Sequence, residues 1–236
     1  MMNPLAIVGF ALGMRHGTDP DHLAAIDGLA RICPRPTNGA FFALGHGLVV
    51  ILLAIGIGHV LADRFAYLGP WTLILIGAAN LWRLFRGAPQ SAVGNLPIVA
   101  QPFLLGMLLA AGFETASQLS ALILAGRTNA WLLGVAFSFG MVLVDGFDGY
   151  LAATTQRLAA AHQGNAVAAS RALGILVVIF AFGLGGAELA GLDLKQFALP
   201  TGLTLFVAVL GIRIWARMSR SEPESRKCAN EQGRYQ

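Results

Sequence analysis

Long apolar stretches alternate with short polar ones along nearly the whole chain. A helix rises about 1.5 Å per residue, so about 20 residues cross a hydrocarbon core of about 30 Å. Prolines and glycines separate the apolar stretches, as turn residues commonly do between helices. The pattern predicts an all-α polytopic membrane protein with seven transmembrane helices. These lie at residues 3–31, 38–61, 67–85, 98–126, 130–156, 170–191 and 197–216.

The composition supports a membrane protein. The chain has 236 residues, of which 56% are hydrophobic and 12% are charged, whereas soluble domains carry about 25% charged residues. No Lys or Arg precedes Arg15, so the N-terminal segment lacks the basic start of a secretory signal peptide. The two cysteines, Cys33 and Cys228, lie beside basic segments that we expect in the cytosol, so no disulfide is expected.

Basic residues are distributed unequally between the two sides of the predicted bundle. Of the 16 Lys and Arg residues, Arg15 lies within the first span and three others lie on one side. The remaining twelve lie on the opposite side, six of them after residue 212. The positive-inside rule then predicts an outside N-terminus and a cytosolic C-terminus in the inner membrane. We expect one transmembrane domain, residues 1–216, and a disordered polar tail, residues 217–236. This tail accounts for much of the basic charge without a nucleic-acid partner.

A weak internal repeat relates two segments, residues 3–85 and 98–191. At an offset of 95 residues the matched positions include Gly17 with Gly112, and Phe42 with Phe137. Each unit has three helices, so the second copy would insert upside down, with one extra helix at the C-terminus. Inverted repeats are typical of transporters. Because the matched residues are common in membrane helices, chance similarity is the alternative.

The predicted spans contain an unusual set of ionisable residues. Such residues are costly in a membrane and tend to mark ion or substrate paths. Imidazole and carboxylate groups together suit divalent transition metals. We therefore take these side chains as candidate metal ligands: His16, Asp19, Asp21, His22, His46, Glu114, Asp145 and Asp148.

The first span, with the stretch MRHGTDPDHLAAID, holds half of these candidates. On a straight helix His16, Asp19 and His22 share one stripe, and Asp21 points away. Pro20 cannot donate a hydrogen bond to the carbonyl of His16, so it must kink or unwind this turn. We expect the break to re-aim Asp21 and to free the His16 carbonyl for an ion.

Several of these residues also have simpler interpretations. Asp19 lies four residues after Arg15, and the two charges could simply neutralise each other. A lone buried histidine such as His46 is usually a packing or hydrogen-bonding residue. We expect Asp27 to lie at the membrane interface and Glu188 to have a structural role.

Four stretches of the chain resemble the nickel/cobalt transporter family. The first, RHGTDPDHLAAID, has a histidine, four residues and then Asp-His within a membrane helix. The others follow in the family's order: FFALGHGLVV, LAAGFETASQ and FGMVLVDGFDG. The resemblance covers about residues 13–150. It implies an inner-membrane permease for Ni²⁺ or Co²⁺, with His16, Asp21 and His22 essential, the metal as substrate and no cofactor.

The chain also departs from the family pattern. Family members commonly have eight spans, and this chain matches from the second onward. Gly47 stands where the family usually has serine, Glu114 and Gln118 where it has Asp and Glu, and Gly146 where it has Thr.

These departures leave the metal and the direction of transport open. The alternatives are a metal or small-solute exporter of the same fold and, less favoured, a seven-helix zinc hydrolase. The hydrolase is disfavoured because its last span would need two histidines and residues 197–216 have none. The divalent ion and the lipid bilayer are the expected partners, and the sequence does not reveal an oligomeric state or an auxiliary subunit.

Overall fold

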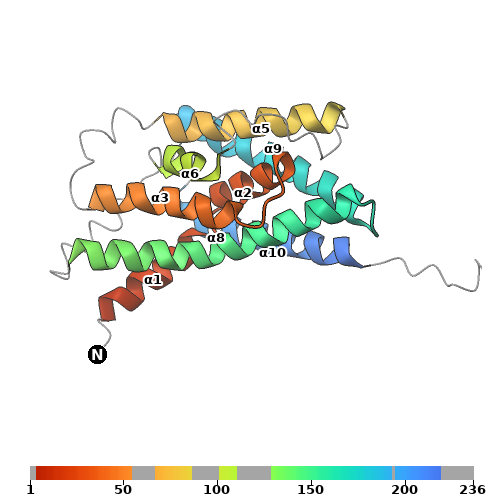
Figure 1. The fold of residues 1–236 in the computed structure, drawn as a ribbon. Coiled ribbons are helices and arrows are strands. Elements are labelled where there is room, and N and C mark those ends of the chain that lie inside the picture. Colours follow the sequence, from red (N-terminus) through yellow and green to blue (C-terminus); the bar gives the residue numbers. More distant parts are fainter. Residues whose placement is uncertain (1–3, 55–66, 87–100, 111–128, 193–194, 219–236) are drawn as a thin grey trace, which may run out of the picture.

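The computed structural model describes residues 4–54, 67–86, 101–110, 129–192 and 195–218 (Figure 1). Every regular element in these ranges is a helix, which confirms the predicted all-α class. The helices are α1 (Pro4–His16), α2 (Pro20–Ile32), α3 (Asn38–Ala54), α5 (Leu68–Arg86), α6 (Pro102–Ala110), α8 (Ala130–Ala160), α9 (Ala166–Leu189) and α10 (Lys195–Arg217).

Three of the described helices are long and apolar enough to cross a membrane. They cover Ala130–Ala160, Ala166–Leu189 and Gln196–Arg217. This confirms a membrane protein at the level of helix length and composition. The number of seven spans stays a prediction, because parts of the second and fourth predicted spans lie outside the described residues.

The predicted first span is two helices, not one. Helix α1 ends at His16, and α2 begins with Pro20 as its first residue, where the missing N–H of proline costs nothing. Asp19 precedes it in an extended conformation, with φ −65° and ψ 146°, as is usual for a residue before proline. The prediction of an unwound turn at Pro20 is therefore confirmed.

The prediction that the His16 carbonyl is free to bind an ion was wrong. The backbone N–H of Asp19 donates to the carbonyl of His16 at 2.9 Å. The N–H and the hydroxyl of Thr18 both donate to the carbonyl of Arg15, at 3.0 and 2.6 Å. Backbone and side-chain groups of the turn itself thus donate to the carbonyls that the break leaves without a helical donor.

Helix α2 lies in the middle of the bundle (Figure 1) and is its most buried element. All residues from Pro20 to Arg31 are buried, and α2 contacts α3, α5, α8, α9 and α10. Small residues allow this close packing: a side chain at Gly28 would overlap Ile76 of α5. The charged residues of α2 therefore face protein on all sides.

Helices α1 and α8 pack through a reciprocal pair of glycine contacts. A Cβ atom at Gly13 would overlap the carbonyl of Phe137, and one at Gly140 would overlap the carbonyl of Phe10. Each glycine therefore lets the backbone of the other helix approach closely.

Helices α3 and α6 repeat this arrangement. A Cβ atom at Gly106 would overlap the carbonyl of Phe42, and one at Gly45 would overlap the carbonyl of Phe103. Both contacts again join the phenylalanine of one Phe-x-x-Gly sequence to the glycine of another. The two helix pairs thus share one mode of packing.

Candidate metal site

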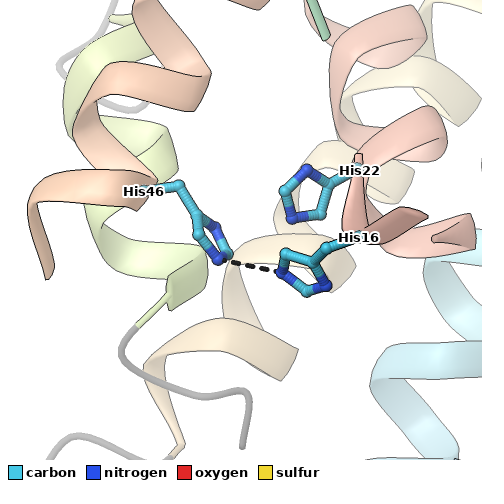
Figure 2. Close-up of side chains that lie close together, drawn as sticks. All are labelled: His16, His22 and His46. Carbon is cyan, nitrogen blue, oxygen red and sulfur yellow. Dashed lines mark hydrogen bonds between the residues drawn. The ribbon is translucent and has the colours of Figure 1, made fainter. Parts of the chain in front are cut away.

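Three histidines from different parts of the chain converge beside the break between α1 and α2. His16 ends α1, His22 lies in the first turn of α2, and His46 lies in the middle of α3. One ring nitrogen of each lies within 4.8 Å of the others. The Nε2 atoms of His16 and His46 are 3.2 Å apart. The three rings face one another (Figure 2), so they can act on a common ligand.

The histidine cluster is almost closed off from the surface. His22 and His46 are fully buried, and the side chain of His16 is 13% exposed. Within the described residues, His22 Nε2 and His46 Nδ1 have no hydrogen-bond partner. A buried imidazole nitrogen without a partner is costly, and an ion bound at His22 Nε2 would supply the interaction that this nitrogen lacks.

Two carboxylates orient two of these rings. Asp19 Oδ2 lies 2.7 Å from His16 Nδ1, and Asp145 Oδ2 on α8 lies 3.0 Å from His22 Nδ1. Such carboxylate–histidine pairs fix the tautomer, so that Nδ1 carries the proton and Nε2 presents a lone pair. Asp19 and Asp145, which the sequence suggested as ligands, therefore lie behind the histidines as hydrogen-bond partners.

The pair of Asp19 with His16 also bears on the simpler interpretation of Asp19. Its carboxylate is hydrogen-bonded to the histidine, and Arg15 contributes only a weaker electrostatic interaction.

The other predicted site residues occupy different positions. Asp21 is 6% exposed, its Oδ2 has no hydrogen-bond partner within the described residues, and it is not part of the histidine group. Asp148 is ion-paired with Arg213 of α10 and is not part of the histidine group. Glu114 lies outside the described residues.

Asp27 and Arg213 are buried more deeply than the sequence suggested. Asp27 was expected at the membrane interface, but it is only 2% exposed and lies 3.0 Å from Arg213. Arg213 was counted among the basic residues of the cytosolic side, yet it is also 2% exposed. Its position inside the apolar run VLGIRIW was the only sequence signal for a buried role.

Buried histidines beside a broken helix in an apolar helical protein are typical of transporters. The comparisons with known proteins show which family the chain is similar to. The model of the high-affinity nickel-transport protein family matches residues 3–63, which contain all three histidines. No solved structure matches the chain.

Several curated proteins are similar over longer stretches. The hydrogenase nickel incorporation protein HupN of Bradyrhizobium diazoefficiens is 26% identical, over 87% of this chain and 68% of that protein. The high-affinity nickel transport protein of Cupriavidus necator is 28% identical, over 82% and 72%. The cobalt transport protein NhlF of Rhodococcus rhodochrous is 44% identical over 54 residues, covering 21% and 15%.

These matches confirm the resemblance to the nickel/cobalt transporter family. The matched family and the relatives from Cupriavidus necator and Rhodococcus rhodochrous are named as transport proteins, in agreement with the expectation that the chain is not an enzyme. In such proteins the metal ion is the substrate and not a cofactor.

Proposed function

We propose that the chain is a secondary permease that carries Ni²⁺ or Co²⁺ across the inner membrane into the cytosol. The observation that carries this proposal is the convergence of His16, His22 and His46. Neutral imidazoles bind these metals well. The similarity to nickel and cobalt transport proteins supports the same substrates.

The spacing of the histidine nitrogens suits a single ion. Metal–nitrogen bonds of about 2.0–2.1 Å place two neighbouring ligands of one ion roughly 3 Å apart. The 3.2 Å between His16 Nε2 and His46 Nε2 agrees with that separation. His22 is oriented by Asp145 and completes a three-nitrogen set. Asp21 and Glu114 remain candidates for further ligands. Asp21 directly precedes His22 in the sequence.

The membrane potential can drive uptake without another energy source. Moving two positive charges through about 100 mV is worth roughly 4.6 kcal/mol, or about a thousandfold accumulation. This direction requires the outside N-terminus and cytosolic C-terminus that the basic residues predict. The same histidine site would serve an exporter, and the direction of flux has to be measured.

The paired glycine contacts support an inverted repeat. The equivalent positions differ by 95 residues for Phe42 and Phe137, and by 93 residues for Phe10 and Phe103. Helix α3 runs antiparallel to α8, since Gly39 approaches Asp145 and Ile51 approaches Gly134. The unit of α1 and α3 then corresponds to the unit of α6 and α8 with its direction reversed.

Metal uptake by cells that express the chain tests the proposal. We expect His16→Ala, His22→Ala and His46→Ala each to abolish uptake of nanomolar Ni²⁺ or Co²⁺ while the protein remains in the membrane. His162→Ala is the matched control, because His162 is exposed in the turn after α8. Normal metal uptake by each of the three single histidine variants would overturn the proposed site.

A further inference from the structure

A second buried cluster of charges joins α10 to the two helices that carry the site. The guanidinium of Arg213 lies between two carboxylates. Its Nη1 donates to Asp148 Oδ1 at 2.6 Å, and its Nη2 lies 3.2 Å from Asp148 Oδ2 and 3.0 Å from Asp27 Oδ1. The three side chains are between 1% and 3% exposed.

This cluster lies further along two helices that also carry residues of the histidine site. Asp148 follows Asp145 by three residues on α8, and Asp27 follows His22 by five residues on α2. At about 1.5 Å per residue, these steps correspond to roughly 4.5 and 7.5 Å along the helix axes. Both carboxylates thus lie within about two helical turns of the residues that form the histidine site.

Within the described residues, Arg213 is the one cation in direct contact with both carboxylates of this cluster. Two carboxylates carry two negative charges, and Arg213 neutralises one of them. Arg31 contributes electrostatically to Asp27, but its guanidinium is hydrogen-bonded to Asn80 and Ser170. A divalent ion could neutralise both carboxylates at once.

Stability alone is a weak explanation for such a cluster. A buried ion pair can often be replaced by apolar residues without loss of stability, because desolvation offsets the attraction between the charges. Ionisable residues inside a membrane protein more often serve transport.

We propose that Arg213 is a tethered cation that closes the path of the transported metal at Asp27 and Asp148. The metal ion passes these carboxylates only when the guanidinium moves away. Arg213 is thus a positioning residue of the transport cycle, and its return hinders an ion from moving back to the histidines. The role of Arg213 in transport rests on the proposed function. The replacement of its guanidinium by a metal ion at Asp27 and Asp148 can be measured without transport.

The test is the number of Mn²⁺ or Ni²⁺ ions bound by purified protein at equilibrium. Arg213→Met should bind one more ion than the wild type, because the two carboxylates then lack their cation. Adding Asp148→Asn should remove the extra ion, whereas adding His22→Ala should leave it. Arg217→Met, which removes an exposed basic residue one turn further along α10, should not change the number.

An unchanged number of ions in Arg213→Met would overturn the inference. The comparison is made with the wild type's own number, so it remains valid even if the histidines bind no ion. If Arg213→Met unfolds without metal, Mn²⁺ should raise its melting temperature more than that of the wild type, since an ion that binds the folded state stabilises it. A variant that remains unfolded with Mn²⁺ would also contradict the inference.

Discussion

Replacing Asp145 by asparagine separates the orientation of His22 from its direct contact with the metal. Asp145 Oδ2 lies 3.0 Å from His22 Nδ1, and both side chains are fully buried. An asparagine oxygen can accept the same hydrogen bond but carries no negative charge. The imidazole therefore keeps a partner, while its Nε2 becomes a less basic ligand.

The expected effect of Asp145→Asn follows from comparable carboxylate–histidine–metal arrangements. Loss of such a supporting group weakens metal binding by about 10–100-fold, which is roughly 1.4–2.8 kcal/mol. Asp19→Asn is the matched comparison, because Asp19 holds His16 in the same way at 2.7 Å but is 16% exposed. Water screens the partly exposed charge, so we expect the smaller loss for Asp19→Asn.

Equilibrium dialysis of purified protein against radioactive nickel measures both variants. A melting curve without metal shows that each variant is folded. If Asp145→Asn binds Ni²⁺ as tightly as the wild type, the carboxylate does not tune His22. If it loses binding as completely as His22→Ala does, Asp145 is itself a ligand, and the arrangement argued above is wrong.

Three further predictions concern the site and its orientation. Imidazole binds metal only when it is neutral, and its unperturbed pKa is about 6.5, so the affinity of the protein for Ni²⁺ should fall as the pH is lowered from 7.5 to 5.5. Equal affinity at both pH values in equilibrium binding would show that carboxylates alone hold the ion. Pro20→Ala lets Asp19 adopt a helical conformation and join α1 to α2, so metal binding should be weaker than in the wild type but stronger than in His22→Ala. Normal metal binding would show that the break does not depend on Pro20. A reporter fused after Arg234 should be active only if it functions in the cytosol, and activity of a periplasmic reporter there would reverse the predicted direction of the chain.

Local features of the site could be predicted from the sequence because they depend on few neighbours. Proline fixes its own backbone and restricts the residue before it, so the break before Pro20 required no knowledge of the fold. His16 and His22 are close because the break lies between them. His46 was a candidate because it is ionisable within a predicted span, but that it joins them depends on the packing of α3 beside this turn, which the sequence pattern does not determine.

The roles of the aspartates could not be predicted in the same way. Asp145 and Asp148 are one turn apart on α8 and look equivalent as sequence, yet one contacts His22 and the other Arg213. The difference arises from the packing of α2 and α10 against α8, which depends on distant segments. Arg213 was counted only as a basic residue of the cytosolic side for the same reason, since burial near the end of a span is a property of the bundle.

The central claim is that the three histidines carry a divalent metal through the membrane. The most direct measurement is Ni²⁺ accumulation in proteoliposomes that contain the purified chain, with an imposed potential that is negative inside. We predict accumulation by the wild type, dependent on the potential, and none by His22→Ala. Equal accumulation by the wild type and by His22→Ala, or no accumulation by the wild type, would contradict the account.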